Sequence, residues 1–267
     1  MEYTDNNIDT REHLTVAHPI PGEIVGPAYQ SLWGPIQWPD PSMLPYFTPS
    51  FKNYMEEVAR VEKMLRELMA EAIGVDGATL NSLFDETQEY RMRMIKYLGP
   101  QATASEEDLQ ALGAHQDHTF TTLIYQITEH VALQAKNGRG EWIDCPPKPD
   151  SLVFVIGKSG QAATYGICSA AVHRVTALPP GSTDRLSISV GTNLRYDTSV
   201  LSPSSMQALE TIQRNGNARY PGVGEKPDGY LSPLGPLDTL GMKVLHNYGV
   251  SYPEIMKRWV GSTSLFC

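Results

Sequence analysis

The sequence predicts a mainly β protein with flanking helices, arranged as a jelly roll. Between residues 120 and 194, short stretches rich in β-branched and aromatic residues alternate with glycine and proline turn signals. No long helical pattern interrupts these stretches. Many short strands without intervening helices are typical of an antiparallel sandwich or barrel, and a jelly roll fits them best.

Composition limits the kind of protein this is. The chain has 267 residues, of which 41% are hydrophobic, and it can bury one sizeable core, so we expect a single domain over residues 1–267. A net charge of -9 without Lys/Arg clusters argues against a nucleic-acid partner. No stretch is long enough to span a membrane, and the polar start lacks an apolar signal region. We therefore expect no membrane association and a cytoplasmic location.

Three cysteines, Cys145, Cys168 and Cys267, are widely separated and show no Cys-x-x-Cys spacing. Such spacing would be needed for a zinc or redox site, so we expect reduced thiols. Residues 1–49 are rich in proline and glycine and predict an irregular segment that wraps the main body, with Trp33 and Trp38 as apolar anchors. We expect about the first fifteen residues to be disordered.

An amphipathic helix is predicted over residues 51–69, with Ser50 as its cap and Gly74 as its stop. Glu56 with Arg60, and Glu62 with Arg66, stand four apart and are expected on the outer side. The helix should serve as support for the core rather than as a cofactor groove. Its proposed apolar face recurs at three- and four-residue spacing: Phe51, Tyr54, Met55, Val58, Val61, Met64, Leu65, Leu68 and Met69.

Helical and strand patterns alternate with turn signals along the rest of the chain. A short helix is expected over residues 78–84, then a strand over 89–98 in which Arg93, Ile95 and Tyr97 share one side. A polar loop should fill residues 100–108. Asn137-Gly138 predicts a hairpin turn. Further strands are expected at 120–126, 131–135, 141–144, 151–156, 171–175 and 185–194. Beyond Ser199 we expect loops and then two helical pieces, at 237–247 and 252–260.

The stretch from Gly113 to His118 carries the chemistry. On a strand, His115 and Asp117 would point to the same face, two residues apart. Two histidines and one carboxylate with open positions indicate non-heme Fe(II) oxygenase chemistry, and His173 on a later strand could be the third ligand. The alternatives are a chance His-x-Asp pattern on a polar turn and a structural role for His173.

Arg185 and Ser187 share a face of the following strand. A guanidinium fork beside a hydroxyl can bind a carboxylate through two hydrogen bonds and add a third. This pair therefore implies a small diacid as co-substrate.

Taken together, His115-Gln116-Asp117, His173, Arg185-Leu186-Ser187 and the earlier Tyr97 resemble the plant-type, isopenicillin-N-synthase-like family of Fe(II)/2-oxoglutarate-dependent dioxygenases. Within this family, the amino-acid sequence of these segments loosely resembles most the AOP-type and auxin-oxidising plant enzymes. The resemblance covers residues 85–200, where it implies a catalytic jelly-roll core, the double-stranded β-helix. Relative to the family, the chain is expected to be short at its N-terminus.

The resemblance implies that His115, Asp117 and His173 hold Fe(II). It also implies that Arg185 and Ser187 bind the distal carboxylate of 2-oxoglutarate, with Tyr97 near the co-substrate. The enzyme would then use O2 and 2-oxoglutarate to hydroxylate or otherwise oxidise a small organic metabolite of specialised metabolism, and would release succinate and CO2. The sequence leaves the metabolite, the exact oxidation and the oligomeric state open.

Some observations keep other readings open. Ile95 replaces an asparagine that many members use near 2-oxoglutarate. A zinc hydrolase could use His118 as well, but the metallo-β-lactamase pattern needs a histidine where Gly113 stands. A non-catalytic or 2-oxoglutarate-independent member of the same fold is the other alternative.

Three residues are expected to border the iron on the substrate side: Arg93, Gln116 and Phe120.

Overall fold

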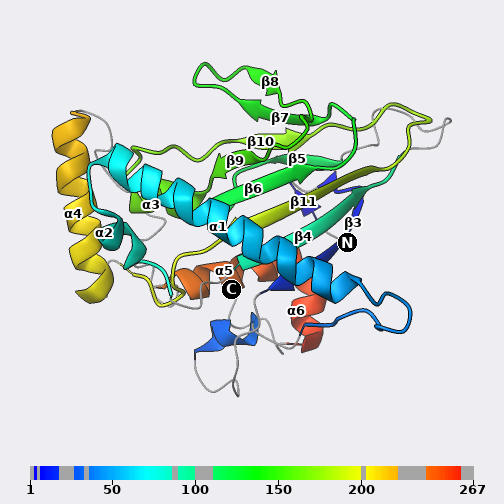
Figure 1. Cartoon of the computed structure of the whole chain (residues 1–267), viewed down its shortest axis with the longest axis horizontal. Helices are drawn as coiled ribbons and strands as arrows, with labels where there is room; N and C mark the ends of the chain where they lie inside the picture. Colours follow the sequence, from blue (N-terminus) through cyan, green and yellow to red (C-terminus); the bar gives the residue numbers. More distant parts are fainter. Residues whose placement is uncertain are drawn as a thin grey trace.

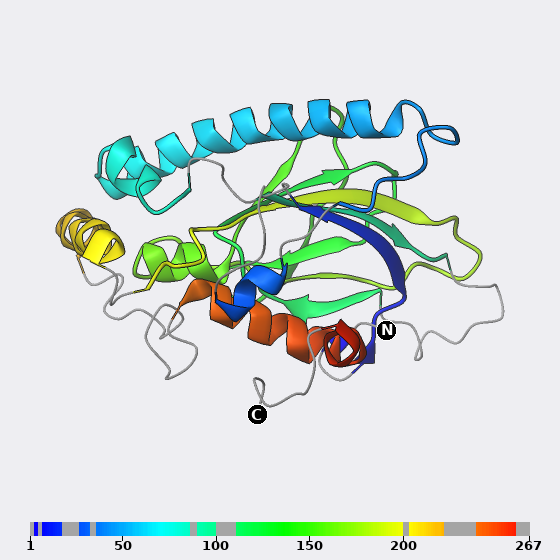
Figure 2. The same cartoon turned by 90° about the horizontal axis from the view of Figure 1, so that it is seen from below.

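The computed structural model describes residues 3–4, 7–17, 27–32, 36–85, 90–99, 111–199, 203–221 and 239–259. Two antiparallel sheets lie face to face, with a long helix on one side of them and shorter helices on the other (Figures 1 and 2). Apolar side chains from both sheets meet in one buried cluster, among them Ile95 and Ile124 from one sheet and Leu133 and Val175 from the other. The predicted mainly β jelly roll with flanking helices is confirmed.

The larger sheet has five strands in the order β3-β4-β11-β6-β9, all paired antiparallel. β4 and β11 pair over their full lengths, so that Arg185 lies opposite Tyr97 and Gly191 opposite Arg91. The strand bounds are β3 Arg11–Ala17, β4 Tyr90–Tyr97, β6 Thr121–Gln126, β9 Val153–Ile156 and β11 Arg185–Thr192.

The smaller sheet has the order β5-β10-β7-β8, and a separate two-stranded ladder joins β1 to β2. A hairpin connects β7 to β8, as predicted from Asn137-Gly138. The glycine in the left-handed conformation is Gly140, at φ 81°, because the Asn137 side chain caps the amides of residues 139 and 141 in a longer turn. The bounds are β1 Tyr3–Thr4, β2 Asn7–Ile8, β5 Leu112–His115, β7 Leu133–Lys136, β8 Trp142–Asp144 and β10 His173–Val175.

Helix α1, Phe47–Ile73, packs on the outer face of the larger sheet. Gly74 ends it in the left-handed conformation, as predicted. The predicted cap was wrong: Ser50 lies inside the first turn, and Tyr46 precedes the helix without a side-chain cap bond. Phe51 and Val58 are buried against the sheet as expected.

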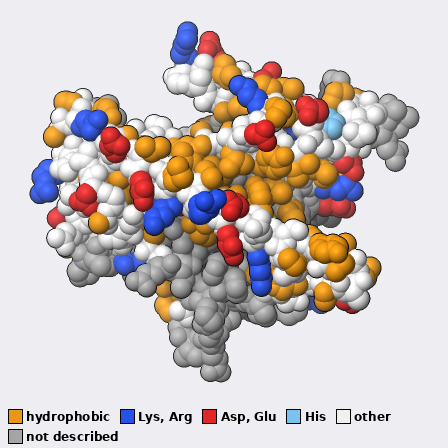
Figure 3. Space-filling view, in the orientation of Figure 1, with side chains coloured by type: hydrophobic (Ala, Val, Ile, Leu, Met, Phe, Trp, Pro, Cys, Tyr) orange, Lys and Arg blue, Asp and Glu red, His pale blue; other side chains and the backbone are white. Residues whose placement is uncertain are grey.

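The predicted polarity of α1 was wrong in its C-terminal half. Glu62 and Arg66 point inward and are buried as a pair, with 3.8 Å between carboxylate and guanidinium. Val61, Met64 and Leu68 are exposed instead. Figure 3 shows apolar side chains gathered on the face over which α1 runs. The side of α1 that faces the sheet therefore includes this buried ion pair and differs from the most apolar side of the helix.

The N-terminal segment contains a strand that the sequence did not predict. β3 pairs along β4 over its whole length at the edge of the larger sheet, so this part of the chain is ordered. Trp38 packs edge-on against Phe51 at 5.0 Å between ring centroids, which agrees with its expected role as an anchor. Trp33, the loop at residues 100–108 and Cys267 lie outside the described residues.

The helices beyond α1 differ in part from the prediction. The predicted loop after Ser199 is wrong at residues 203–219, which form a helix with Leu209 and Ile212 buried. The two C-terminal helical pieces are confirmed with shifted bounds. The helices beyond α1 are α2 Gly77–Asn81, α3 Lys158–Ala163, α4 Pro203–Arg219, α5 Leu240–Ser251 and α6 Pro253–Trp259, and η1 Ala28–Leu32 is a 3-10 turn that packs on α5.

Two further expectations concern the chain as a whole. Cys145 and Cys168 are free thiols, as predicted. Within the described part of the chain, every helix is too short or too polar to cross a bilayer.

Candidate metal and co-substrate site

A cavity of about 580 Å³ lies between the two sheets. Its wall takes alternate side chains from β4, including Arg91, Arg93 and Tyr97, because residues two apart on a strand point to one face. β11 contributes Arg185 and Ser187 in the same way. One end of the cavity is lined by α5. The inward faces of both sheets thus present polar groups to one shared cavity.

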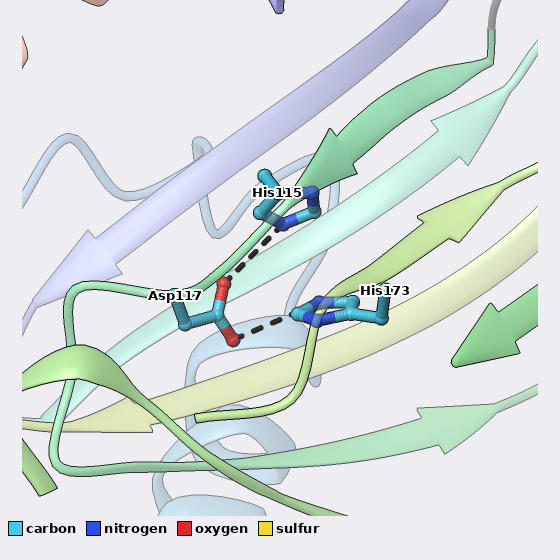
Figure 4. Close-up of side chains that lie close together, drawn as sticks. All are labelled: His115, Asp117 and His173. Atoms are coloured by element: carbon cyan, nitrogen blue, oxygen red, sulfur yellow. Dashed lines mark ion pairs between the residues drawn. The ribbon is translucent and has the colours of Figure 1, made fainter. Parts of the chain in front are cut away.

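His115, Asp117 and His173 come together on the wall that the smaller sheet provides (Figure 4). His115 ends β5 and is the direct cross-strand partner of His173, the first residue of β10. Asp117 lies beyond the end of β5, so its position does not follow from strand alternation as predicted. The Lys158 amide donates to the Asp117 carbonyl at 2.7 Å and holds this turn against the start of α3.

The donor atoms of the three side chains lie within 4.8 Å of one another. His115 Nε2 is 3.4 Å from one carboxylate oxygen of Asp117, and His173 Nε2 is 3.9 Å from the other. Two imidazoles and a carboxylate are a donor set that suits Fe(II) and leaves coordination positions open. Within the described residues, this set fits the metal that the resemblance implies.

Both histidines are oriented by a hydrogen bond from the ring to the backbone carbonyl two residues earlier. Nδ1 of His115 lies 2.9 Å from the carbonyl of Gly113, and Nδ1 of His173 lies 3.0 Å from the carbonyl of Ala171. A carbonyl can only accept, so each Nδ1 carries a proton, and Nε2 is the ring nitrogen that faces the carboxylate of Asp117. Partners of this kind fix the tautomer of a metal-binding histidine.

The charges of the three groups are coupled. Burial would raise the pKa of Asp117, but the hydrogen bond from His115 and the nearby His173 hold that pKa well below its usual value. Burial would lower the pKa of His115, but Asp117 raises it above the ordinary value, whereas burial keeps the pKa of His173 low. The carboxylate is therefore ionised and attracts positive charge, which a divalent cation can supply.

His118 lies outside the set of converging donors, as expected. Its Nδ1 is 3.0 Å from Nδ2 of Asn247 on α5, and burial lowers its pKa to about 4. Among the described residues, the group that could hold a metal contains His115, Asp117 and His173 and does not include His118, which a zinc hydrolase could have used as a ligand.

Arg185 is buried at the other end of the cavity, with 1% of its surface exposed. Its guanidinium lies 5.0 Å from the centre of the Tyr97 ring, and it donates to Gln126 Oε1 at 2.9 Å and to Ser187 Oγ at 3.5 Å. All of these partners are neutral, and within the described part of the chain no carboxylate forms an ion pair with it. A buried cation without a counter-charge fits an anionic ligand such as the distal carboxylate of 2-oxoglutarate.

The structure places two of the three expected substrate-side residues in the cavity and the third in the core. Arg93 lines the cavity. Gln116 also lines it, but its amide donates to the Ala170 carbonyl at 2.9 Å. The expectation for Phe120 is wrong: it is fully buried in the core and packs edge-on against Phe84. β6 begins only at residue 121, so the alternation that turns Thr122 into the cavity does not extend back to Phe120.

Asn247 and Tyr248 on α5 line the cavity and were not predicted. Helical spacing around residues 237–247 was visible in the sequence. Which side chains of that helix face the site depends on how it docks, about 130 residues after the metal motif in the chain.

Residues 90–193 match the family model of the 2OG-Fe(II) oxygenase superfamily. The 2-oxoglutarate-dependent dioxygenase frbJ of Dothideomycetidae sp. (strain 11243) is 31% identical over 261 residues, which is 97% of this chain and 70% of that protein. A 2-oxoglutarate-dependent dioxygenase of Gibberella zeae is 33% identical over 59% of this chain and 42% of its own length.

Among solved structures, that of a full-length Neurospora crassa protein in complex with alpha-KG is similar in fold. The TM-score is 0.62 at 19% identity, covering 79% of this chain and 66% of that one. The chain therefore belongs to the 2OG-Fe(II) oxygenase superfamily. It is an oxidoreductase of the 2-oxoglutarate-dependent dioxygenase class with a double-stranded β-helix fold, and the implied cofactors, Fe(II) and 2-oxoglutarate, are those of the family. Placement beside the AOP-type and auxin-oxidising plant enzymes stays a prediction.

Proposed function

We propose that this protein hydroxylates a small organic metabolite, with His115, Asp117 and His173 as the Fe(II) ligands. Arg185 and Ser187 bind the distal carboxylate of 2-oxoglutarate, and Tyr97 packs beside it. A specialised metabolite as substrate and a cytoplasmic location are part of the same proposal.

One observation carries this proposal. The buried guanidinium of Arg185, which has only neutral partners among the described residues, faces the same cavity as a His-Asp-His cluster with both Nε2 atoms presented inward. A structural cluster would not need a distant uncompensated cation in the same cavity. A metal-chelating dianion such as 2-oxoglutarate accounts for both ends at once.

The chain's own residues have limited roles in this chemistry. Fe(II) with 2-oxoglutarate and O2 supplies the oxidising power, with succinate and CO2 as by-products. The carbonyl partners of the two histidines hold a proton on each Nδ1, which leaves Nε2 as the ring nitrogen that would bind the metal. Arg185 and Ser187 orient the co-substrate along the cavity, and the packed walls of the two sheets limit the access of water.

The test is an anaerobic titration of the full chain with Fe(II) and 2-oxoglutarate. We expect the weak visible charge-transfer band of the chelate, and succinate formation once air is admitted. A band without succinate, in the presence of a broad panel of metabolites, would favour the non-catalytic alternative. No band and no succinate would overturn the 2-oxoglutarate assignment.

Asp117→Ala tests the metal ligands. We expect iron retention after desalting to fall by at least about tenfold, because the only ionised donor of the set is lost. Asp144→Ala, a change on the exposed β8 hairpin, is the matched control and should retain iron like the parent chain. Unchanged iron content in Asp117→Ala would place the metal elsewhere.

A further inference from the structure

The end of the cavity opposite Arg185 carries a second group of cationic side chains. Arg91 and Arg93 project from β4, and Lys158 projects from the start of α3. Arg93 lies four residues along the strand from Tyr97, the partner of Arg185, which corresponds to about 13 Å. The two positive regions are therefore separate places in one cavity.

Tyr248 of α5 joins the two arginines. Arg91 Nη1 donates to the Tyr248 hydroxyl at 2.7 Å, and its guanidinium carbon lies 5.1 Å from the centre of the ring. Arg93 also hydrogen-bonds this hydroxyl. Burial would raise the pKa of Tyr248, but the two arginines bring it below its ordinary value. Two guanidinium groups thus converge on one phenol oxygen at this end of the cavity.

The Tyr248 hydroxyl is also a donor. A phenol oxygen has two lone pairs and one proton, and the two arginines occupy the lone pairs. Among the described residues no acceptor takes the remaining O–H. A ligand oxygen placed beside this hydroxyl would receive its hydrogen bond while lying close to two guanidinium groups.

The charge of the cavity wall contrasts with that of the chain. The protein has a net charge of -9, yet Asp117 is the only acidic residue among the described residues that line the cavity. Asp117 already lies between two histidines, and Arg11 is paired with Asp9 at 3.5 Å. A cavity with such a local excess of positive charge attracts anions.

We propose that the substrate is an organic anion whose acidic group, a carboxylate or a phosphonate, binds at Arg91, Arg93 and Tyr248. This inference rests on the proposed function, because it assigns Arg185 to the co-substrate. It also gives α5 a role in binding, since the helix supplies the phenol that completes the anion site beside the metal cluster.

The experiment uses three probes of matched shape: phenylacetate, benzylphosphonate and the neutral phenylacetamide. The full chain is loaded with Mn(II) and 2-oxoglutarate, and relaxation of the probe protons by Mn(II) reports both affinity and nearness to the metal. We expect at least one anion to bind about tenfold more tightly than the amide. The stronger of the two anions identifies the acidic group.

Arg93→Gln and Tyr248→Phe should each reduce the preference for the anion, and Arg93→Lys should retain part of it. Arg139→Gln, on the exposed hairpin, is the matched control and should change nothing. Equal binding of the anions and the amide would overturn the proposal. So would an anion preference that persists in both Arg93→Gln and Tyr248→Phe, or that is abolished by Arg185→Gln instead.

Failure of this proposal differs from failure of the proposed function. If Mn(II) does not bind, saturation transfer to the probes in metal-free protein still measures the anion preference at Arg93. Suppose that Mn(II) and 2-oxoglutarate bind to Arg93→Gln as they do to the parent chain, and that the three probes bind equally well to the parent chain and to Arg93→Gln. Then only the proposal of an anionic substrate is wrong. The thermal unfolding midpoint of each variant confirms that it is folded.

Discussion

Two buried arginines in this protein occupy similar surroundings and differ in one respect. Arg66 lies 4.0 Å from the centre of the Phe84 ring, and Arg185 lies 5.0 Å from that of Tyr97. Arg66 has a carboxylate, Glu62, one helical turn away, whereas Arg185 has only neutral partners among the described residues. The arginine on α1 thus has its counter-charge within the fold, whereas Arg185 is the one for which we propose a counter-charge from a bound ligand.

The largest expected effect is on Arg66. Arg66→Met leaves Glu62 buried without its cation and should lower the free energy of unfolding by about 3–5 kcal/mol, measured by urea unfolding. The double change Glu62→Met with Arg66→Met should recover most of this loss, because apolar side chains of similar size replace the pair. A single variant as stable as the double variant would mean that the pair is not coupled.

Arg185→Gln should have the opposite profile. Removal of a cation without a counter-charge should leave the free energy of unfolding of the ligand-free chain unchanged or increase it. The Kd for 2-oxoglutarate should rise about 100-fold, while that for Fe(II) stays the same. The double variant at residues 62 and 66 is the control and should bind 2-oxoglutarate normally. An unchanged Kd in Arg185→Gln would remove the distinction between the two arginines.

The smallest effect concerns the pH dependence of the Glu62 pair. Burial, more than Arg66 and Tyr90 can offset, raises the pKa of Glu62 above its ordinary value. A raised carboxyl pKa contributes stability below the unfolded-state value that is lost as the pH rises through the folded-state value. Glu62→Gln removes this dependence, so its stability relative to the parent chain should increase from pH 5 to pH 8. Glu57→Gln, exposed on the same helix, should show no such trend.

Much of the site could be read from the sequence because its parts lie on regular elements. Arg185 and Ser187 are two apart on β11, and Tyr97 is on the neighbouring strand β4, so strand alternation placed all three in the cavity. The structure also brings His115, Asp117 and His173 together, as expected for a candidate metal cluster. The reason given for Asp117 was incomplete, because a turn held by α3 positions it and not the strand.

Other parts depend on contacts between distant segments. The buried face of α1 was misjudged because Glu62 and Arg66 neutralise each other, and single-residue hydrophobicity does not register a pair. Phe120 was misplaced because the first residue of a strand is hard to locate. In α4, by contrast, Met206, Leu209 and Ile212 stand three apart, and this local signal was available.

The edge strand β3 has a consequence for how the chain folds as it is made. Its partner β4 follows about 80 residues later, which corresponds to several seconds of synthesis at roughly 5–20 residues per second. During that interval the segment must remain unpaired. Its charged and polar residues, Arg11, Glu12, His13 and Thr15, make it a poor template for other chains. The same polar composition that made this strand hard to predict from the sequence therefore disfavours pairing with other chains until β4 has been synthesised.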